Sequence, residues 1–108
     1  MMLKLFAVFD AKAAFFGQPF SDQQEGSAIR NFSDAVNDGT NPNNMWNKHP
    51  EDFSLFQVGE FDNNTGELIS MTPKALVTAS ALKHLDYSNG SDAIKIHDRI
   101  KDQVKIEA

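Results

Sequence analysis

Three side chains that could bind a metal ion lie close together in the sequence: His49, Glu51 and Asp52. A histidine nitrogen and two carboxylate oxygens are metal ligands, but zinc sites generally combine more nitrogen or sulfur ligands at regular spacings. No second histidine stands three or four residues from His49, and His84 and His97 are isolated. The sequence therefore predicts no metal site and no cofactor.

A group of carboxylates surrounds the segment DNNTGE, which begins at Asp62 and ends at Glu67. The segment resembles the start of a calcium-binding loop, but its glycine comes one position too early. Paired carboxylates can act as acid and base, yet the chain has no nucleophile elbow, no glycine-rich phosphate loop and no cysteine. We therefore interpret the segment as a solvated turn, and we expect no catalytic residues and no enzymatic activity.

Binding of nucleic acid would need cations for the phosphates and aromatic rings for the bases. The residues that could supply them are Lys4, Lys12, Arg30, Trp46, Lys48 and His49, with Phe16 and Tyr87 as further rings for stacking. The net charge of −5 opposes a strong non-specific grip on nucleic acid, and the same cations could be unrelated surface charges. Trp46, the only tryptophan, is either a core residue or a stacking platform, and burial is the commoner state of such a ring.

The elements that would position these residues follow from the hydrophobic pattern. Residues 3–9 (LKLFAVF) predict a strand that is apolar on both faces, which is typical of a strand that is central in its sheet or covered on both sides. A loop whose phenylalanines cap the core follows this strand. A helix is then predicted from about Glu25, with Ser21 and Gln24 as a capping box, and residues 37–39 (NDG) end it.

The second half of the chain predicts a hairpin between polar segments. Residues 39–52 are rich in asparagine and predict a loop. Residues 53–61 and 67–71 predict two strands joined by the DNNTG turn, with Gly59 as the site of a bulge. The pair Thr72-Pro73 then predicts the start of a second helix.

These elements give the order β-α-β-β-α and an α+β fold of two layers. The predicted sheet is three-stranded and mainly antiparallel, with the helices on one face. Residues 1–87 form a single domain, and residues 88–108 form a C-terminal extension that is either an amphipathic helix or partly disordered. Because a chain of 108 residues builds a small core, we expect a homodimer that shares buried surface. No apolar run is long enough for a membrane span or a signal peptide, so we expect no membrane partner.

Several segments resemble the small nonstructural protein of gokushoviruses, which are Microviridae bacteriophages with single-stranded DNA genomes. The segments are KLFAVFDAKA, QPF, EGSAIRNFSDAVND and KHPEDFSLFQVGEFDNNTGEL, and the most specific are the KHPEDF box (48–53) and the pattern LFxxGxFDxxTG (55–66). The similarity covers residues 2–76. It implies a nonstructural accessory protein in the cytoplasm of the infected host bacterium.

The same resemblance implies a role in single-stranded DNA genome synthesis or packaging, through weak binding of single-stranded DNA. The alternative is a protein–protein interaction module that regulates a viral replication protein or procapsid assembly. The acidic net charge leaves both hypotheses open.

Overall fold

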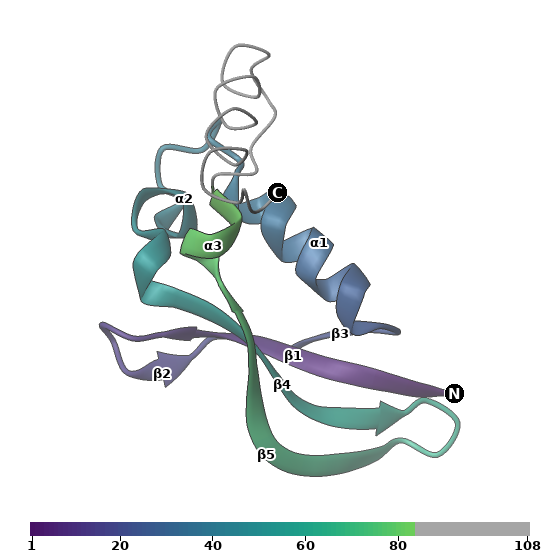
Figure 1. The fold of residues 1–108 in the computed structure, drawn as a ribbon. Helices are drawn as coiled ribbons and strands as arrows, with labels where there is room; N and C mark the ends of the chain where they lie inside the picture. Colours follow the sequence, from purple (N-terminus) through teal and green to yellow (C-terminus); the bar gives the residue numbers. More distant parts are fainter. Residues whose placement is uncertain (84–108) are drawn as a thin grey trace, which may run out of the picture.

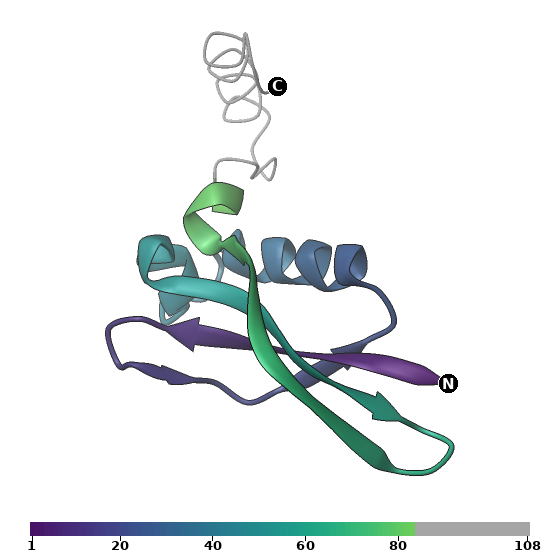
Figure 2. The same cartoon turned by 60° about the horizontal axis from the view of Figure 1, so that its bottom comes forward.

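The computed structural model describes residues 1–83, and the predicted C-terminal extension lies outside these residues. The described part is an α+β fold with an antiparallel sheet, as predicted. Figure 1 shows its α-helices on one side of the sheet, and the turned view in Figure 2 shows the strands forming the other side. Within residues 1–83 no helix is long and apolar enough to cross a membrane.

The sheet is built around β1 (Met2–Asp10), which pairs along both of its edges. One edge pairs antiparallel with β4 (Phe53–Asp62), which in turn pairs with β5 (Glu67–Thr78). The other edge pairs with two short strands, β2 (Phe15–Phe16) and β3 (Phe20–Asp22). The expected central position of β1 is confirmed. The prediction of three strands is wrong, because residues 1–83 form a sheet of five.

The two additional strands occupy a segment that the sequence predicts to be a loop. A central strand needs partners for the backbone N–H and C=O groups of both edges, and this segment supplies them to β1. Between β2 and β3 the pairing is interrupted, although the amide of Gly17 still donates to the carbonyl of Val8 at 2.8 Å. Phe20 packs on Phe6 with ring centroids 5.8 Å apart, so this segment does contribute to the core.

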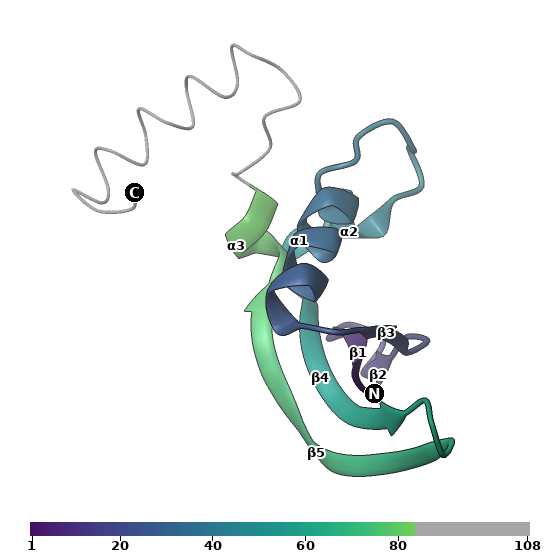
Figure 3. The same ribbon diagram turned by 90° about the vertical axis from the view of Figure 1, so that its right-hand side faces the viewer.

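The fifth strand, β5, runs through Thr72-Pro73, where the sequence predicts a helix. That prediction is wrong, because the second edge of β4 also needs a partner and β-branched residues suit a strand. Pro73 falls where the register shifts opposite Gln57 and Gly59, so its missing N–H costs no regular ladder bond. The helix that follows, α3, is described over Ala79–Lys83 and begins later than the sequence predicts, because β5 occupies the residues before it. Figure 3 shows β4 and β5 curling together away from the helices.

The turn between β4 and β5 has the chemistry that the DNNTG segment predicts. The side chain of Asp62 accepts a hydrogen bond from the amide of Asn64 at 2.9 Å. The carbonyl of Asp62 accepts from the amide of Gly66 at 2.7 Å. Gly66 has a φ of +80°, in the left-handed region that favours glycine. The prediction of a turn here is therefore confirmed.

The long helix, α1 (Glu25–Val36), begins where expected but without the predicted capping box. Ser21 lies in β3 instead, and the Asp22 side chain accepts from the amides of Gln23 at 2.7 Å and Gln24 at 3.4 Å. One face of the helix is buried against the sheet. The core consists of Phe6, Val8, Ala28, Phe32, Val36, Phe53, Leu55, Ala79 and Leu82.

The asparagine-rich segment after α1 contains two short helices instead of only a loop. These are α2 (Met45–Lys48) and the 3-10 turn η1 (Pro50–Asp52). The Asn44 amide nitrogen donates to the carbonyl of Ala35 at 2.8 Å, and its oxygen accepts from the amide of Trp46 at 3.2 Å. One side chain thus binds the end of α1 and the start of α2, which fixes the second helix against the first.

Candidate functional site

The predicted cations lie on different parts of the molecule. Lys4 is in β1, where its pairing partners are the acidic residues Asp22 and Glu60. Lys12 lies in the turn that follows the opposite end of the same strand. Arg30 is exposed on α1, on the far side of the helix from its buried residues. The structure brings together only Lys48 and His49, which are adjacent in the sequence.

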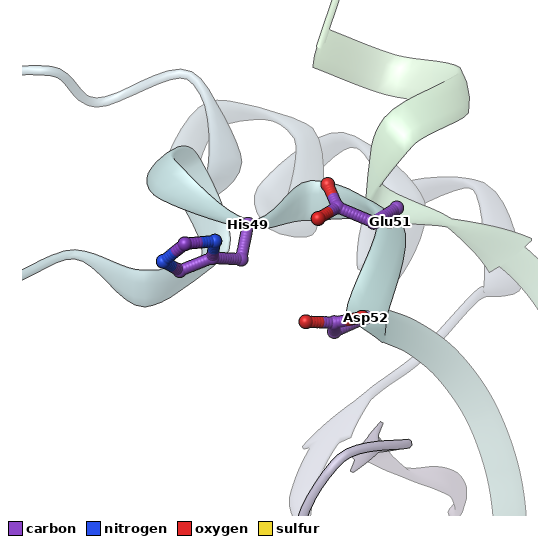
Figure 4. Close-up of side chains that lie close together, drawn as sticks. All are labelled: His49, Glu51 and Asp52. Carbon is purple, nitrogen blue, oxygen red and sulfur yellow. The ribbon is translucent and has the colours of Figure 1, made fainter.

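His49 lies beside two carboxylates, those of Glu51 and Asp52. Each residue offers one atom that could bind a metal, and these three atoms lie within 4.8 Å of one another. Figure 4 shows that both carboxylates point toward the side on which His49 lies. The three groups could hold a divalent cation weakly, with water as the remaining ligands, because two of them are exposed. The carboxylates also put negative charge next to Lys48, which disfavours a phosphate at this position.

Trp46 packs on the core, as the commoner of the two interpretations predicts. Its ring is half-buried and lies 5.2 Å from the ring of Phe32 and 6.5 Å from that of Phe53. It also borders an open hollow of about 470 Å³ whose lining includes Asn43 and Asn44. The Asn44 amide already bonds to backbone groups of α1 and α2, so it is not free to bind a ligand there.

The sheet itself has one covered face and one open face. Phe6 and Val8 of β1 pack under the helices together with Leu55 of β4. Side chains of neighbouring strand residues point to opposite faces, so Phe9 and Phe56 lie on the other side. No described helix covers that side, as Figure 2 shows. We call it the open face.

A bulge in β4 keeps the charged residues of this strand off the open face. The pairing with β1 shifts between Gln57 and Gly59, which leaves Val58 as an extra residue. Beyond the bulge the alternation is displaced by one, so that Phe61 falls on the open face. A Cβ atom at Gly59 would lie 2.7 Å from the carbonyl oxygen of Ile69. The prediction of a bulge at this glycine is confirmed.

Three phenylalanine rings form a cluster on the open face, one each from β1, β2 and β4. The centroids of Phe9 and Phe16 are 4.9 Å apart, those of Phe16 and Phe56 are 5.2 Å apart, and those of Phe9 and Phe56 are 6.0 Å apart. Ala7, the partner of Phe56 in the sheet, is only 2% exposed although no described helix covers it. The rings therefore shield this part of β1, while Phe16 itself remains 40% exposed.

The other end of the open face is also apolar. Leu3 pairs with Phe61, which pairs with Leu68 of β5, and Leu5 pairs with Gly59. Leu68 is 70% exposed. Among residues 1–83, the strand residues that pairing and alternation place on the open face include the serines Ser21, Ser54 and Ser70 but no lysine, arginine, aspartate or glutamate.

Charged residues of the same strands lie on the helix side. Lys4 pairs with Glu60, and Asp62 pairs with Glu67. Lys74 donates from Nζ to the Glu25 carboxylate of α1 at 2.9 Å, and this hydrogen bond holds the pKa of Glu25 below its ordinary value. The strands therefore contain several charged residues, and these residues lie on the helix side of the sheet, not on the open face.

The sequence contains part of the signal for this face. The alternation of Leu3, Leu5, Ala7 and Phe9 predicts a second apolar side of β1, but it does not say whether another element covers that side. The contributions of Phe16, Phe61 and Leu68 could not be predicted, because they depend on β2, on the bulge and on the register of β5. Of the residues predicted for nucleic-acid binding, Phe16 lies on the open face, Tyr87 lies outside the described residues, and the other six lie elsewhere.

The chain matches known phage proteins over most of the described fold. The family model described as Phage ORF5 protein matches residues 3–82. Protein ORF5 of Chlamydia phage 1 is 32% identical over 68 residues, which cover 61% of this chain and 70% of that protein. No solved structure matches the chain. The residues of the open face lie within the span that the family model covers.

Proposed function

Because this chain belongs to the Phage ORF5 protein family, we propose that it is a non-enzymatic accessory protein of single-stranded DNA genome synthesis or packaging. The resemblance to small nonstructural proteins of gokushoviruses is confirmed by that membership. We infer that the protein acts in the cytoplasm of the infected bacterium, through a protein contact made by the open face. The observation that carries this proposal is the exposed, uncharged apolar side of the sheet.

An exposed apolar surface of this kind is typical of protein–protein interfaces. Contiguous apolar patches above a few hundred Å² are uncommon on monomers and mark sites of interaction. Aromatic rings are common anchors of such interfaces, and the open face has a cluster of Phe9, Phe16 and Phe56 at one end. A phosphate backbone would find no cation among the strand residues of this face, and the net charge of −5 would oppose its approach.

The proposal can be tested by the yield of viral genomes. Phe16→Glu adds a charge to the open face, whereas Phe15→Glu adds the same charge to the neighbouring residue, which is 61% exposed and points to the other side. We expect the first change to reduce packaged single-stranded DNA per infected cell at least about tenfold and the second to leave it unchanged. Equal yields from both variants and the parent phage would contradict a role for the open face.

Binding of single-stranded DNA is the second candidate, and the cluster of three rings favours it. Open antiparallel sheets bind single strands by stacking bases on aromatic residues, and Lys12 lies in the turn between β1 and β2. Weak binding is expected, because few cations are near the rings.

Fluorescence anisotropy with a labelled oligonucleotide at low salt tests this second candidate. Phe16→Ala should weaken binding about 5- to 150-fold, the equivalent of one lost base stack, while Phe15→Ala should have little effect. The affinity should also fall as salt is raised. No detectable binding at low salt would rule out DNA as the ligand and leave the protein contact in place.

A further inference from the structure

We propose that the open face is the interface of a homodimer, in which the sheets of two copies pack face to face with their helices outside. This inference rests on the proposed function, in which the open face makes a protein contact, and it identifies the partner in that contact as a second copy of the chain. Two sheets that pack this way form a sandwich whose shared core comes from the two inner faces. The open face of each copy would supply such an inner layer.

The distribution of charge favours a second copy over other occupants. Two molecules with a net charge of −5 repel each other, so a stable contact between them must avoid opposing carboxylates. The open face meets this condition, because the acidic residues of the strands, such as Glu60 and Glu67, lie on the helix side. A strongly basic partner would instead be attracted to the acidic residues on the helix side, because the strands place no carboxylate on the open face.

The size of the face suits a dimer of small domains. β1 is 9 residues long, which corresponds to about 30 Å, and four adjacent strands span about 19 Å. The projected area is therefore at most about 570 Å² before the relief of the side chains is added, because β2 and β3 pair with only part of the edge of β1. A standard interface buries about 800 Å² on each partner. The face therefore corresponds to one of the smaller specific interfaces.

The open face contains apolar side chains that would gain from being covered. Phe16 is 40% exposed and Leu68 is 70% exposed, and they lie on different strands of the same side. A second sheet would bury both ends of the face at once, including the half-buried side chains of Leu3, Leu5 and Phe61. The sandwich would leave α1 and α2 of each copy on the outside, where a viral partner could reach them.

Sedimentation equilibrium of the full chain tests the dimer. We expect the mass of two chains of 12.0 kDa for the parent protein and for Phe15→Glu, which serves as the matched control. Phe16→Glu should weaken association at least about tenfold, because the interface would bury a carboxylate without a partner. Far-UV circular dichroism of both variants checks that they remain folded.

A charge of the opposite sign at the same position provides a second test. Phe16→Lys should associate as poorly as Phe16→Glu, because either charge would be buried in the interface without a partner. A parent protein that stays at 12.0 kDa, or a Phe16→Glu chain that dimerises as tightly as the parent, would overturn the inference.

The two proposals fail in different ways. If the chain is a monomer but the Phe16→Glu phage loses genome yield, the homodimer is wrong and the role of the open face in infection stands. If the chain dimerises through this face but Phe16→Glu and Phe15→Glu phage give equal yields, the dimer stands and the proposed function is wrong. Phe16→Glu and Phe15→Glu therefore provide the matched pair for both measurements.

Discussion

Replacing Gly59 by alanine should destabilise the protein, while the same replacement at Gly26 should stabilise it. A Cβ atom at Gly59 would lie 2.7 Å from the carbonyl oxygen of Ile69, which is backbone of the neighbouring strand and cannot turn away. β5 would have to shift outward by several tenths of an ångström to restore an ordinary contact. Overpacking of this kind costs about 1–3 kcal/mol.

The control at Gly26 has the opposite sign for a clear reason. This glycine lies in the first turn of α1, and no heavy atom is within 4 Å of an added Cβ. Alanine loses less backbone entropy on folding than glycine, so Gly26→Ala should add about 0.5–1 kcal/mol. Urea unfolding followed by far-UV circular dichroism, analysed with a common slope, measures both changes. A Gly59→Ala variant as stable as the parent would refute the close approach of β5 to the bulge.

Four further substitutions test other parts of the described fold, each by urea unfolding. Trp46→Ala should lower the unfolding free energy by about 2–4 kcal/mol, since its half-buried ring packs on the core, and an unchanged stability would point to a surface role. Asn44→Ala should cost about 1–3 kcal/mol, because it removes the partner of backbone groups at the ends of both helices; a neutral effect would contradict this. Ala14→Gly should add about 1 kcal/mol by relieving a φ of +62°, and a loss would show that the turn differs. The bond to Lys74 lowers the pKa of Glu25 from its ordinary 4.5, so this pair stabilises the fold above that pH and its contribution is lost as the pH falls through the lowered value. Glu25→Gln should therefore flatten the acid limb of the stability curve, and an unchanged limb would contradict the pairing.

The parts of the fold that local chemistry determines were predictable from the sequence. The DNNTG turn follows from the ability of Asp62 to accept backbone bonds and of Gly66 to adopt a positive φ. The face of α1 follows from helical periodicity. The bulge at Gly59 follows from a glycine that interrupts a strand. Each of these signals lies within a few residues of the element that it determines.

The parts that depend on pairing between distant segments were not predictable in the same way. Thr72-Pro73 has the pattern of a helix start, yet β5 continues through it because the edge of β4 is available for pairing. Phe15 and Phe16 have no strand pattern of their own and pair only because β1 has a free edge. Local propensity is a weak prior, and such tertiary contacts override it.

The candidate site illustrates the same division. The sequence indicates the types of residue that bind nucleic acid but not where they lie, and Lys4 and Lys12 fall at opposite ends of β1. The open face depends on the alternation of several strands and on one bulge, so no single segment indicates it. Its three clustered rings, those of Phe9, Phe16 and Phe56, come from β1, β2 and β4.

The most direct test of the open face as the working surface is solvent accessibility by NMR. A soluble paramagnetic agent added to the full chain broadens the signals of side chains that water can reach. A covered open face predicts that Phe16 and Leu68, which are 40% and 70% exposed in the single chain, are protected, while Phe15 and Met45 are strongly broadened. Equal broadening of Phe16 and Phe15, with protection on the helix side, would contradict that assignment.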